Sequence, residues 1–140
     1  MKILLPVDGS DHTKRMLAYI AAHDELLGAG HEYQVFTAVG AIPPSASRML
    51  AREAIGGHYT EQAELVLAPV RAFAAQQHWT ARVSHGHGRA GELIAALATA
   101  EKVDLIVMGT HGHSALANVV LGSVVSGVLA RCKAPVLLIR

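Results

Sequence analysis

The sequence is poor in the residues that form covalent cross-links. Its 140 residues include a single cysteine, Cys132, so no internal disulfide can form, and a chain of this length buries enough surface to be stable without one. Cys132 falls on the apolar side of the last predicted helix, where we interpret it as a buried structural thiol. Because a disulfide and a recognisable secretory signal are both lacking, we expect a cytoplasmic protein that folds as one domain over residues 1–140.

An excess of charge of one sign is also lacking. Twelve Lys and Arg residues stand against eleven Asp and Glu residues, which leaves a formal net charge of +1. Proteins that bind nucleic acids use a strong positive excess to neutralise phosphates, so we expect no nucleic-acid partner. The apolar runs are shorter than the roughly 20 residues that cross a bilayer, so we expect no membrane association.

What the sequence does contain is a regular alternation of strand-like and helix-like segments. Apolar and β-branched runs predict strands at residues 3–7, 33–39, 79–84, 105–108 and 136–139. The alternation of apolar and polar residues in 79–84 predicts an edge strand, whereas the unbroken apolar run 105–108 predicts a central one. Strands joined by helices in this way predict an α/β fold, a doubly wound five-stranded parallel sheet.

Helices are predicted between the strands from apolar residues that recur every three or four positions. In the first, second and third helices these residues are Leu17, Ile20, Ala21 and Leu27; Tyr59, Ala63, Val66, Val70 and Phe73; and Leu93, Ile94, Leu97 and Ala98. The first helix should start at Ser10 or Asp11, which are good N-caps, and end at Gly28 and Gly30. Gly56 and Gly57 interrupt or delay the second, so we expect residues 45–57 to form a loop or a frayed turn.

A glycine-rich segment follows the predicted central strand. Gly109 and Gly112 lie directly behind it, and Gly122 and Ser123 follow after nine further residues. Glycines let backbone N–H groups approach an anion, and a helix capped by Ser123 would direct its unsatisfied N–H groups to the same point. The apolar residues of that helix are Val125, Val128, Leu129 and Cys132. This segment therefore predicts a phosphate-binding loop.

The spacing G-x2-G-x9-G-[ST] of these glycines resembles the ATP-binding signature of the universal stress protein family. Residues 3–10, 104–108 and 134–140 fit the same family, so the resemblance spans nearly the whole chain. It implies a Rossmann-like fold, of the adenine nucleotide alpha hydrolase type, with strand order 3-2-1-4-5. Ligands of such sheets bind where the order reverses, which here is between the first and fourth strands.

The resemblance implies that ATP binds at this point, with Mg²⁺ or Mn²⁺. Asp8 would lie near the sugar or the metal ion, Val39 would offer backbone contacts to the base, and Gly122 and Ser123 would hold the terminal phosphates. The residues expected to bind the nucleotide are Pro6, Val7, Asp8, Val39, Met108, Gly109, Thr110, His111, Gly112, His113, Gly122, Ser123, Val124 and Val125. Asp8 also fits a simpler role, because Asp, Gly and Ser often form a turn and a helix cap after a strand.

The chain departs from the family in one respect. No Lys or Arg lies between Gly112 and Gly122, where ATP-binding members often carry a basic residue. Backbone N–H groups, His111, His113 and a divalent cation would have to neutralise the phosphates, so we expect a modest affinity. A member of the family that has lost the nucleotide and acts only as an interaction module is an alternative.

A second glycine cluster suggests a different cofactor. Gly86, Gly88 and Gly91 match G-x-G-x-x-G, the dinucleotide-binding fingerprint. The cluster follows the predicted edge strand rather than the first strand, however, and Asp104 opens the next strand instead of ending it. A turn and a helix start are therefore favoured over an NAD or FAD site.

Histidines form two His-x-His pairs, His85 with His87 and His111 with His113. In extended backbone the two members of a pair point to one face and could bind one metal ion. No cysteine cluster or HExxH helix supports a transition-metal site, so we favour a polar loop for each pair.

Signs of catalysis are lacking as well. The chain contains neither the G-x-x-x-x-G-K-[ST] loop nor the G-x-S-x-G nucleophile elbow. We expect a regulatory stress-response protein that binds ATP, with a slow ATP-hydrolysing or nucleotide-transfer enzyme dependent on Asp8 as the alternative.

The strand Val136 to Ile139 would lie at a sheet edge, where unpaired backbone groups favour pairing with another chain. We therefore expect a homodimer, as the resemblance also implies.

Overall fold

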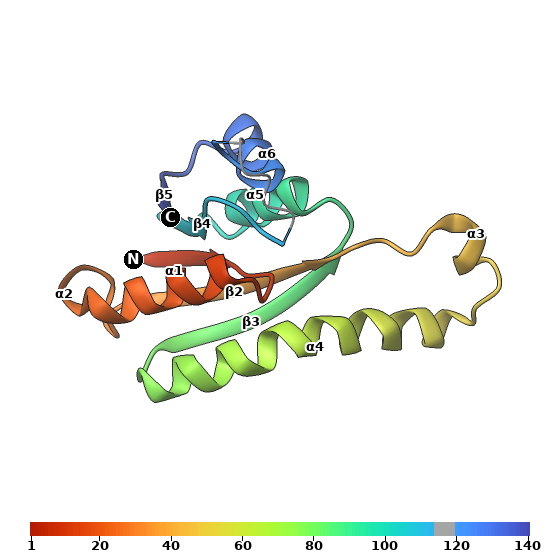
Figure 1. Ribbon diagram of the computed structural model, residues 1–140, viewed down its shortest axis with the longest axis horizontal. Helices are drawn as coiled ribbons and strands as arrows, with labels where there is room; N and C mark the ends of the chain where they lie inside the picture. Colours follow the sequence, from red (N-terminus) through yellow and green to blue (C-terminus); the bar gives the residue numbers. More distant parts are fainter. Residues whose placement is uncertain (114–119) are drawn as a thin grey trace.

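The computed structural model describes residues 1–113 and 120–140. A five-stranded parallel sheet with the order β3-β2-β1-β4-β5 forms the centre of the molecule (Figure 1). The strands are β1 (Lys2–Pro6), β2 (Glu32–Val39), β3 (Thr80–His87), β4 (Leu105–Gly109) and β5 (Val136–Ile139). The predicted fold class and the strand order implied by the resemblance are both confirmed.

Helices cover both faces of the sheet. They are α1 (Asp11–Ala22), α2 (Asp24–Leu27), α3 (Pro44–Ser47), α4 (Arg52–Gln76), α5 (Ala90–Ala100) and α6 (Ser123–Arg131). Side chains of α1 and α4 pack with one face of the sheet in a first core cluster, and side chains of α5 and α6 pack with the other face in a second. We call these the α1/α4 face and the α5/α6 face.

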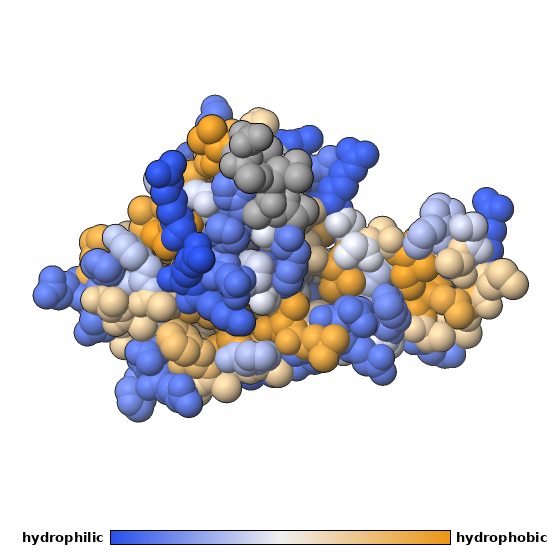
Figure 2. Space-filling model, viewed as in Figure 1, coloured by the Kyte–Doolittle hydropathy of each residue, from blue (hydrophilic) through white to orange (hydrophobic). Residues whose placement is uncertain are grey.

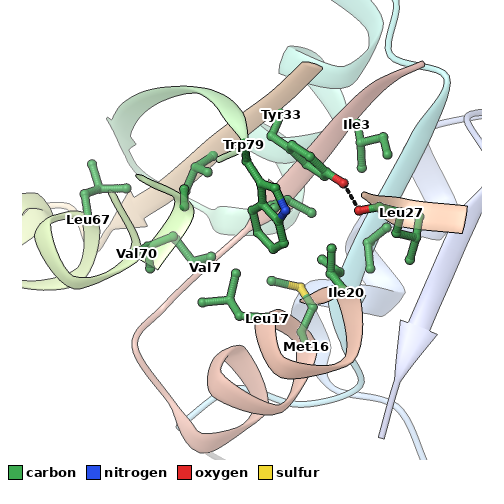
Figure 3. Close-up of a cluster of buried hydrophobic side chains, with 14 of the residues drawn as sticks. Ile3, Val7, Met16, Leu17, Ile20, Leu27, Tyr33, Leu67, Val70 and Trp79 are labelled. Atoms are coloured by element: carbon green, nitrogen blue, oxygen red, sulfur yellow. Dashed lines mark hydrogen bonds between the residues drawn. The ribbon is translucent and has the colours of Figure 1, made fainter. Parts of the chain in front are cut away.

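The α1/α4 face contains the buried rings of Tyr33 and Trp79 (Figure 3). The ring of Tyr33 stacks on Trp79 with 4.8 Å between centroids, and Phe73 meets Trp79 edge-on at 5.7 Å. The hydroxyl of Tyr33 donates to the carbonyl oxygens of Leu27 and Gly28. Burial, with a contribution from Asp24, raises the pKa of Tyr33 to about 12, so this hydroxyl stays a hydrogen-bond donor at neutral pH.

Strand positions follow the hydropathy pattern. The alternating segment forms the edge strand β3, which runs on to His87, and the unbroken apolar run forms β4 between β1 and β5. Register along the sheet is uneven: β2 and β3 pair over eight residues, whereas β1 and β4 pair only at Ile3 with Leu105 and Leu4 with Ile106. The carboxyl ends of β1 and β4 therefore lie beyond their paired residues.

The prediction for residues 45–57 is wrong. α3 occupies part of this segment, and α4 begins at Arg52 and continues through Gly56 and Gly57. A glycine inside a helix costs about 0.5–1 kcal/mol relative to alanine, which the packing and hydrogen bonds of a helix of 25 residues outweigh. The beginning of α4 and α3 extend past the sheet (Figure 1), and Figure 2 shows apolar residues at this end of the molecule, where Met49 and Leu50 are exposed.

The first predicted helix is divided into two. α1 ends at Ala22, and Leu27 belongs to the short α2, which ends at Gly28 as expected. Ser10 is the N-cap of α1, and its hydroxyl accepts a hydrogen bond from the N–H of Thr13.

Among the described residues, no helix combines the length and apolar character needed to cross a membrane.

The last helix starts and packs differently from the prediction. Gly122, not Ser123, is the N-cap, because the N–H of Gly122 donates to the carbonyl of Thr110 and fixes Gly122 in extended backbone. α6 then ends at Arg131, so Cys132 lies in the C-cap and is only partly buried. Leu129 is 48% exposed because α6 turns Val125 and Val128, rather than Leu129, toward the sheet.

Candidate functional site

A cavity of about 550 Å³ opens where the strand order reverses, at the carboxyl ends of β1 and β4. The described residues that line it are Pro6, Val7, Asp8, Thr13, Phe36, Ala38, Ala90, Ile94, Met108, Gly109, His111, Gly112, His113, Leu121, Gly122, Ser123, Val124 and Val125. Cavities of this size accommodate small-molecule ligands. Its position is the crevice in which open α/β sheets bind their ligands.

Asp8 is fixed on one side of the cavity by the turn between β1 and α1. Gly9 adopts a φ of +76°, which glycine tolerates and which turns the chain directly into the N-cap of α1. One carboxylate oxygen of Asp8, Oδ1, accepts hydrogen bonds from the N–H of Ser10 and the hydroxyl of Thr13, each at 2.9 Å. The N–H of Asp8 donates to the Thr13 hydroxyl at 3.1 Å. The same residues therefore cap a helix and orient the carboxylate.

The electrostatic setting keeps Asp8 ionised. Burial by itself raises the pKa of this carboxyl, but the hydrogen bonds from Ser10 and Thr13, together with His113, outweigh that effect and leave the pKa below its ordinary value. At neutral pH the cavity therefore contains a negative charge with a fixed position.

The loop after β4 approaches Asp8 closely because it contains glycine. A Cβ on Gly112 would lie 2.5 Å from Oδ2 of Asp8, and a Cβ on Gly109 would lie 2.8 Å from the Cβ of His12. Nε2 of His113 forms a hydrogen bond of 2.7 Å with the carbonyl oxygen of Asp8. A larger residue at 112 would push the loop after β4 away from Asp8, and a larger residue at 109 would push the end of β4 away from α1.

The first turn of α6 supplies the opposite side of the cavity. Ser123, Val124 and Val125 line it, and the first N–H groups of a helix have no partner within the helix. A Cβ on Gly122 would lie 3.2 Å from the carbonyl oxygen of Thr110, so glycine is needed for the close contact between the loop and the helix start. Such a helix start favours an anion, with an effect equivalent to about half a positive charge.

An apolar wall completes the cavity, and sequence reasoning missed it. This wall includes Phe36 and Ala38 on β2 and Ala90 and Ile94 on α5. Phe36 and Ala38 lie two residues apart, so they share one face of β2. This alternation of side chains along the strand could have indicated that Phe36 and Ala38 point the same way. However, β2 is buried on both faces, so its sequence does not reveal which residues face the crevice.

The structure brings together twelve of the fourteen residues predicted to bind a nucleotide and leaves two outside the cavity wall. Val39 packs with the α1/α4 face, and its carbonyl oxygen accepts a hydrogen bond from the N–H of Gly88. Thr110 is buried, and its N–H and carbonyl oxygen bind Ile139 and Gly122. Neither residue lines the cavity.

The glycine cluster after β3 has structural roles. Gly86 lies within the edge strand β3, where a Cβ would meet the ring of Phe36 at 3.3 Å. Gly91 lies against Gly127, and a Cβ on Gly91 would be 3.0 Å from the Cα of Gly127. These glycines let a side chain and a helix pack closely, and Gly86, Gly88 and Gly91 do not line the cavity.

The His-x-His pairs have separate surroundings. His87 stacks on Tyr59 with 4.3 Å between ring centroids, while His113 binds the carbonyl of Asp8. Within residues 1–113 and 120–140, no three His, Cys, Asp or Glu side chains are grouped so that they could hold a metal ion.

A cation that is bound together with an anionic ligand needs fewer protein side chains than a metal ion held by the protein alone. Carboxylate oxygens suit Mg²⁺, which keeps several waters and shares its remaining positions with phosphates. Oδ2 of Asp8 faces Gly112, while the hydrogen bonds from the N–H of Ser10 and the hydroxyl of Thr13 go to the other oxygen, Oδ1. Asp8 therefore fits such an ion.

The chain is similar to known proteins over nearly its whole length. The sequence profile of the universal stress protein family matches residues 1–140. A protein of Thermus aquaticus described as a universal stress protein in the QAH/OAS sulfhydrylase 3′ region is 38% identical over 138 residues, which covers 99% of this chain and 97% of that protein.

Solved structures have the same fold. The structure of hypothetical protein MJ0577, a universal stress protein of Methanocaldococcus jannaschii, matches with a TM-score of 0.79 and 24% identity over 99% of this chain and 94% of that one. The universal stress protein of Archaeoglobus fulgidus in complex with dAMP matches with a TM-score of 0.69 and 20% identity, over 100% and 98% of the two chains.

Proposed function

Because the chain belongs to the universal stress protein family, we propose that its cavity binds an adenine nucleotide, namely ATP with Mg²⁺ or Mn²⁺, as a regulatory ligand. The observation that carries this proposal is the convergence of Asp8, the glycine loop 109–113 and the first turn of α6 on one cavity. Solved structures of this fold include complexes with dAMP, with cAMP and with AMP.

The cavity offers each part of a nucleotide a suitable environment. The apolar wall, with Phe36 and Ile94, suits a base, and the Asp8 carboxylate can accept hydrogen bonds from a sugar or bind a cation. The N–H groups of the glycine loop and of the first turn of α6 suit phosphates.

The state of Asp8 favours binding over turnover. A general base works best when its pKa lies near the working pH, whereas the pKa of Asp8 is lowered. The carboxylate is thus better suited to hold a cation or a hydroxyl group than to remove a proton from water. We therefore propose that occupancy, rather than rapid hydrolysis, is the functional output.

Calorimetric titration of nucleotide-stripped protein with ATP and Mg²⁺ tests the proposal. We expect saturable binding by the parent and none by Ser123→Asp, whose carboxylate at the start of α6 repels phosphates. Asp in the first turn of a helix is favourable, and Ser123 is exposed, so this variant should fold. Gly122→Asp is a second blocking variant at a tighter position.

Gly30→Asp is the matched control. It introduces the same carboxylate at an exposed glycine with open space around it, and it should bind as the parent does. A folded parent that gives no heat at millimolar ATP would contradict the proposal.

We also propose that the protein is a homodimer that pairs through β5. β5 lies at the edge of the sheet, and Val136, Leu137 and Leu138 are only partly buried. The free backbone groups of an edge strand favour pairing with another chain. Sedimentation at micromolar concentration should give the mass of two chains, and a single-chain mass would refute the dimer.

A further inference from the structure

The cavity is short of fixed positive charge. Among the described residues that line it, the ionisable side chains are Asp8, His111 and His113. The sequence has no Lys or Arg between Lys102 and Arg131, so the segment 114–119 adds no such side chain. Histidine has an ordinary pKa of about 6.5 and is mostly neutral above that pH.

Three basic side chains on or next to the helices beside the cavity form ion pairs with carboxylates. Lys14 of α1 pairs with Asp11 at 3.5 Å. Arg89, before α5, and Arg131 of α6 both approach Glu92, at 3.5 and 3.6 Å. These three side chains do not line the cavity.

A phosphate chain in the cavity therefore meets one partial positive charge and one larger negative charge that do not depend on histidine protonation. The first turn of α6 offers the equivalent of about half a positive charge. Asp8 contributes a full negative charge, and its Oδ2 faces Gly112 in the glycine loop. Each further phosphate on a nucleotide adds negative charge near this carboxylate, and like charges at close range are strongly unfavourable.

We propose that the cavity selects nucleotides by charge: without a divalent cation it binds adenosine monophosphate in preference to ATP, and it accepts ATP only as a complex with the cation. Asp8 is the residue that imposes this selection, because its carboxylate repels bare polyphosphate and attracts the cation that neutralises it. The inference rests on the proposed nucleotide function and adds how occupancy depends on phosphate number and on metal.

The test is a calorimetric series with AMP, ADP and ATP at constant ionic strength, first in EDTA and then with Mg²⁺. In EDTA we expect the dissociation constant to increase from AMP to ADP to ATP, by about tenfold or more overall. Addition of Mg²⁺ should bring ATP to at least the affinity of AMP and change AMP by less than about twofold.

Asp8→Asn removes the negative charge of this side chain and keeps its size and shape. The amide oxygen of Asn can still accept the hydrogen bonds from Ser10 and Thr13 that hold the turn. In this variant metal-free ATP should bind about tenfold more tightly than to the parent, and the response to Mg²⁺ should disappear. Asp11→Asn is the control, because it removes an exposed carboxylate of α1 that does not line the cavity, and it should behave as the parent.

The outcomes distinguish the two proposals. Metal-free ATP that binds to the parent as tightly as AMP, or more weakly to Asp8→Asn than to the parent, overturns the selection by charge and leaves nucleotide binding intact. Failure of every nucleotide to bind, with and without Mg²⁺, overturns the proposed function and this inference with it. The nucleotide series on the parent gives a result even if Asp8→Asn does not fold.

Discussion

The two faces of the sheet are built differently. On the α1/α4 face the large rings of Tyr33 and Trp79 fill the space between sheet and helices, and the buried cluster is extensive. On the α5/α6 face the cluster is smaller, the helices approach each other at Gly91 and Gly127, and the cavity lies between them and the sheet. One face is closed by packing, and the other leaves space at the carboxyl ends of the strands.

This difference shows how the molecule separates stability from binding. A filled core stabilises the fold in proportion to the apolar surface that it removes from water. A ligand site needs the opposite, an apolar wall with nothing packed against it, as Phe36 and Ile94 provide. We expect changes at the packed rings of the α1/α4 face to affect stability alone and changes on the α5/α6 face to affect stability and binding together.

The largest effect should come from Trp79→Ala. Trp79 is 8% exposed and contacts the rings of Tyr33 and Phe73, so its removal leaves a large hole in the α1/α4 face. We expect the free energy of unfolding to fall by about 3–5 kcal/mol, measured by urea denaturation. The nucleotide affinity of the folded fraction should be unchanged. A loss below about 1 kcal/mol would mean that this face is not the main source of stability.

Gly91→Ala should have a smaller effect on stability and a clear effect on binding. The new Cβ would meet Gly127 Cα at 3.0 Å and the carbonyl oxygen of Val124 at 3.2 Å. Because both are backbone atoms, α5 and α6 must separate, at a cost of about 1–3 kcal/mol. The start of α6 then moves, so calorimetry should record weaker nucleotide binding. Unaltered affinity would show that the cavity tolerates movement of α6.

Gly57→Ala is the same substitution where nothing crowds the glycine. Gly57 lies inside α4 with open space around its Cα. Alanine should stabilise the helix by about 0.5–1 kcal/mol, measured by the same denaturation, without a change in nucleotide affinity. Destabilisation here would mean that the exposed beginning of α4 has contacts that the fold alone does not explain.

The smallest expected effect is on the stability of the protein at acidic pH. The pKa of Asp8 is lower in the folded protein than its ordinary value of 3.8, so its contribution to stability is fully present above pH 3.8 and is lost as the pH falls through the folded pKa. When the pH is lowered from about 5 to about 3, the parent should lose more stability than Asp8→Asn. Equal losses would show that the hydrogen bonds from Ser10 and Thr13 do not favour the ionised carboxylate.

The sequence predicted the strands better than it predicted the ends of the helices. The strands follow from hydropathy, because a strand buried on both faces needs an unbroken apolar run, as residues 105–108 show. Helix ends depend on hydrogen bonds that form only in the folded chain. The N–H of Gly122 binds the carbonyl of Thr110 and makes Gly122 the cap, a contact that no local pattern reveals.

The polar side of the candidate site was also easier to predict than the apolar side. Glycines and Asp8 have unusual chemistry at recognisable spacings, and the structure places Gly109, Gly112 and Gly122 around one cavity. Phe36 and Ile94 look like ordinary core residues, and their place in the cavity wall depends on how far α5 and α6 stand from the sheet. That distance is a property of tertiary packing.

The short register between β1 and β4 has a mechanical meaning. The sheet consists of two wings, β3-β2-β1 and β4-β5, whose facing strands β1 and β4 pair at two positions, whereas β2 and β3 pair at eight. We expect the boundary between the wings to open before the β2–β3 pairing in local unfolding. A ligand that contacts Asp8 on one wing and Gly109 on the other would connect the two wings and oppose their separation. We therefore expect a bound ligand to reduce the motion of the whole sheet, including its β5 edge.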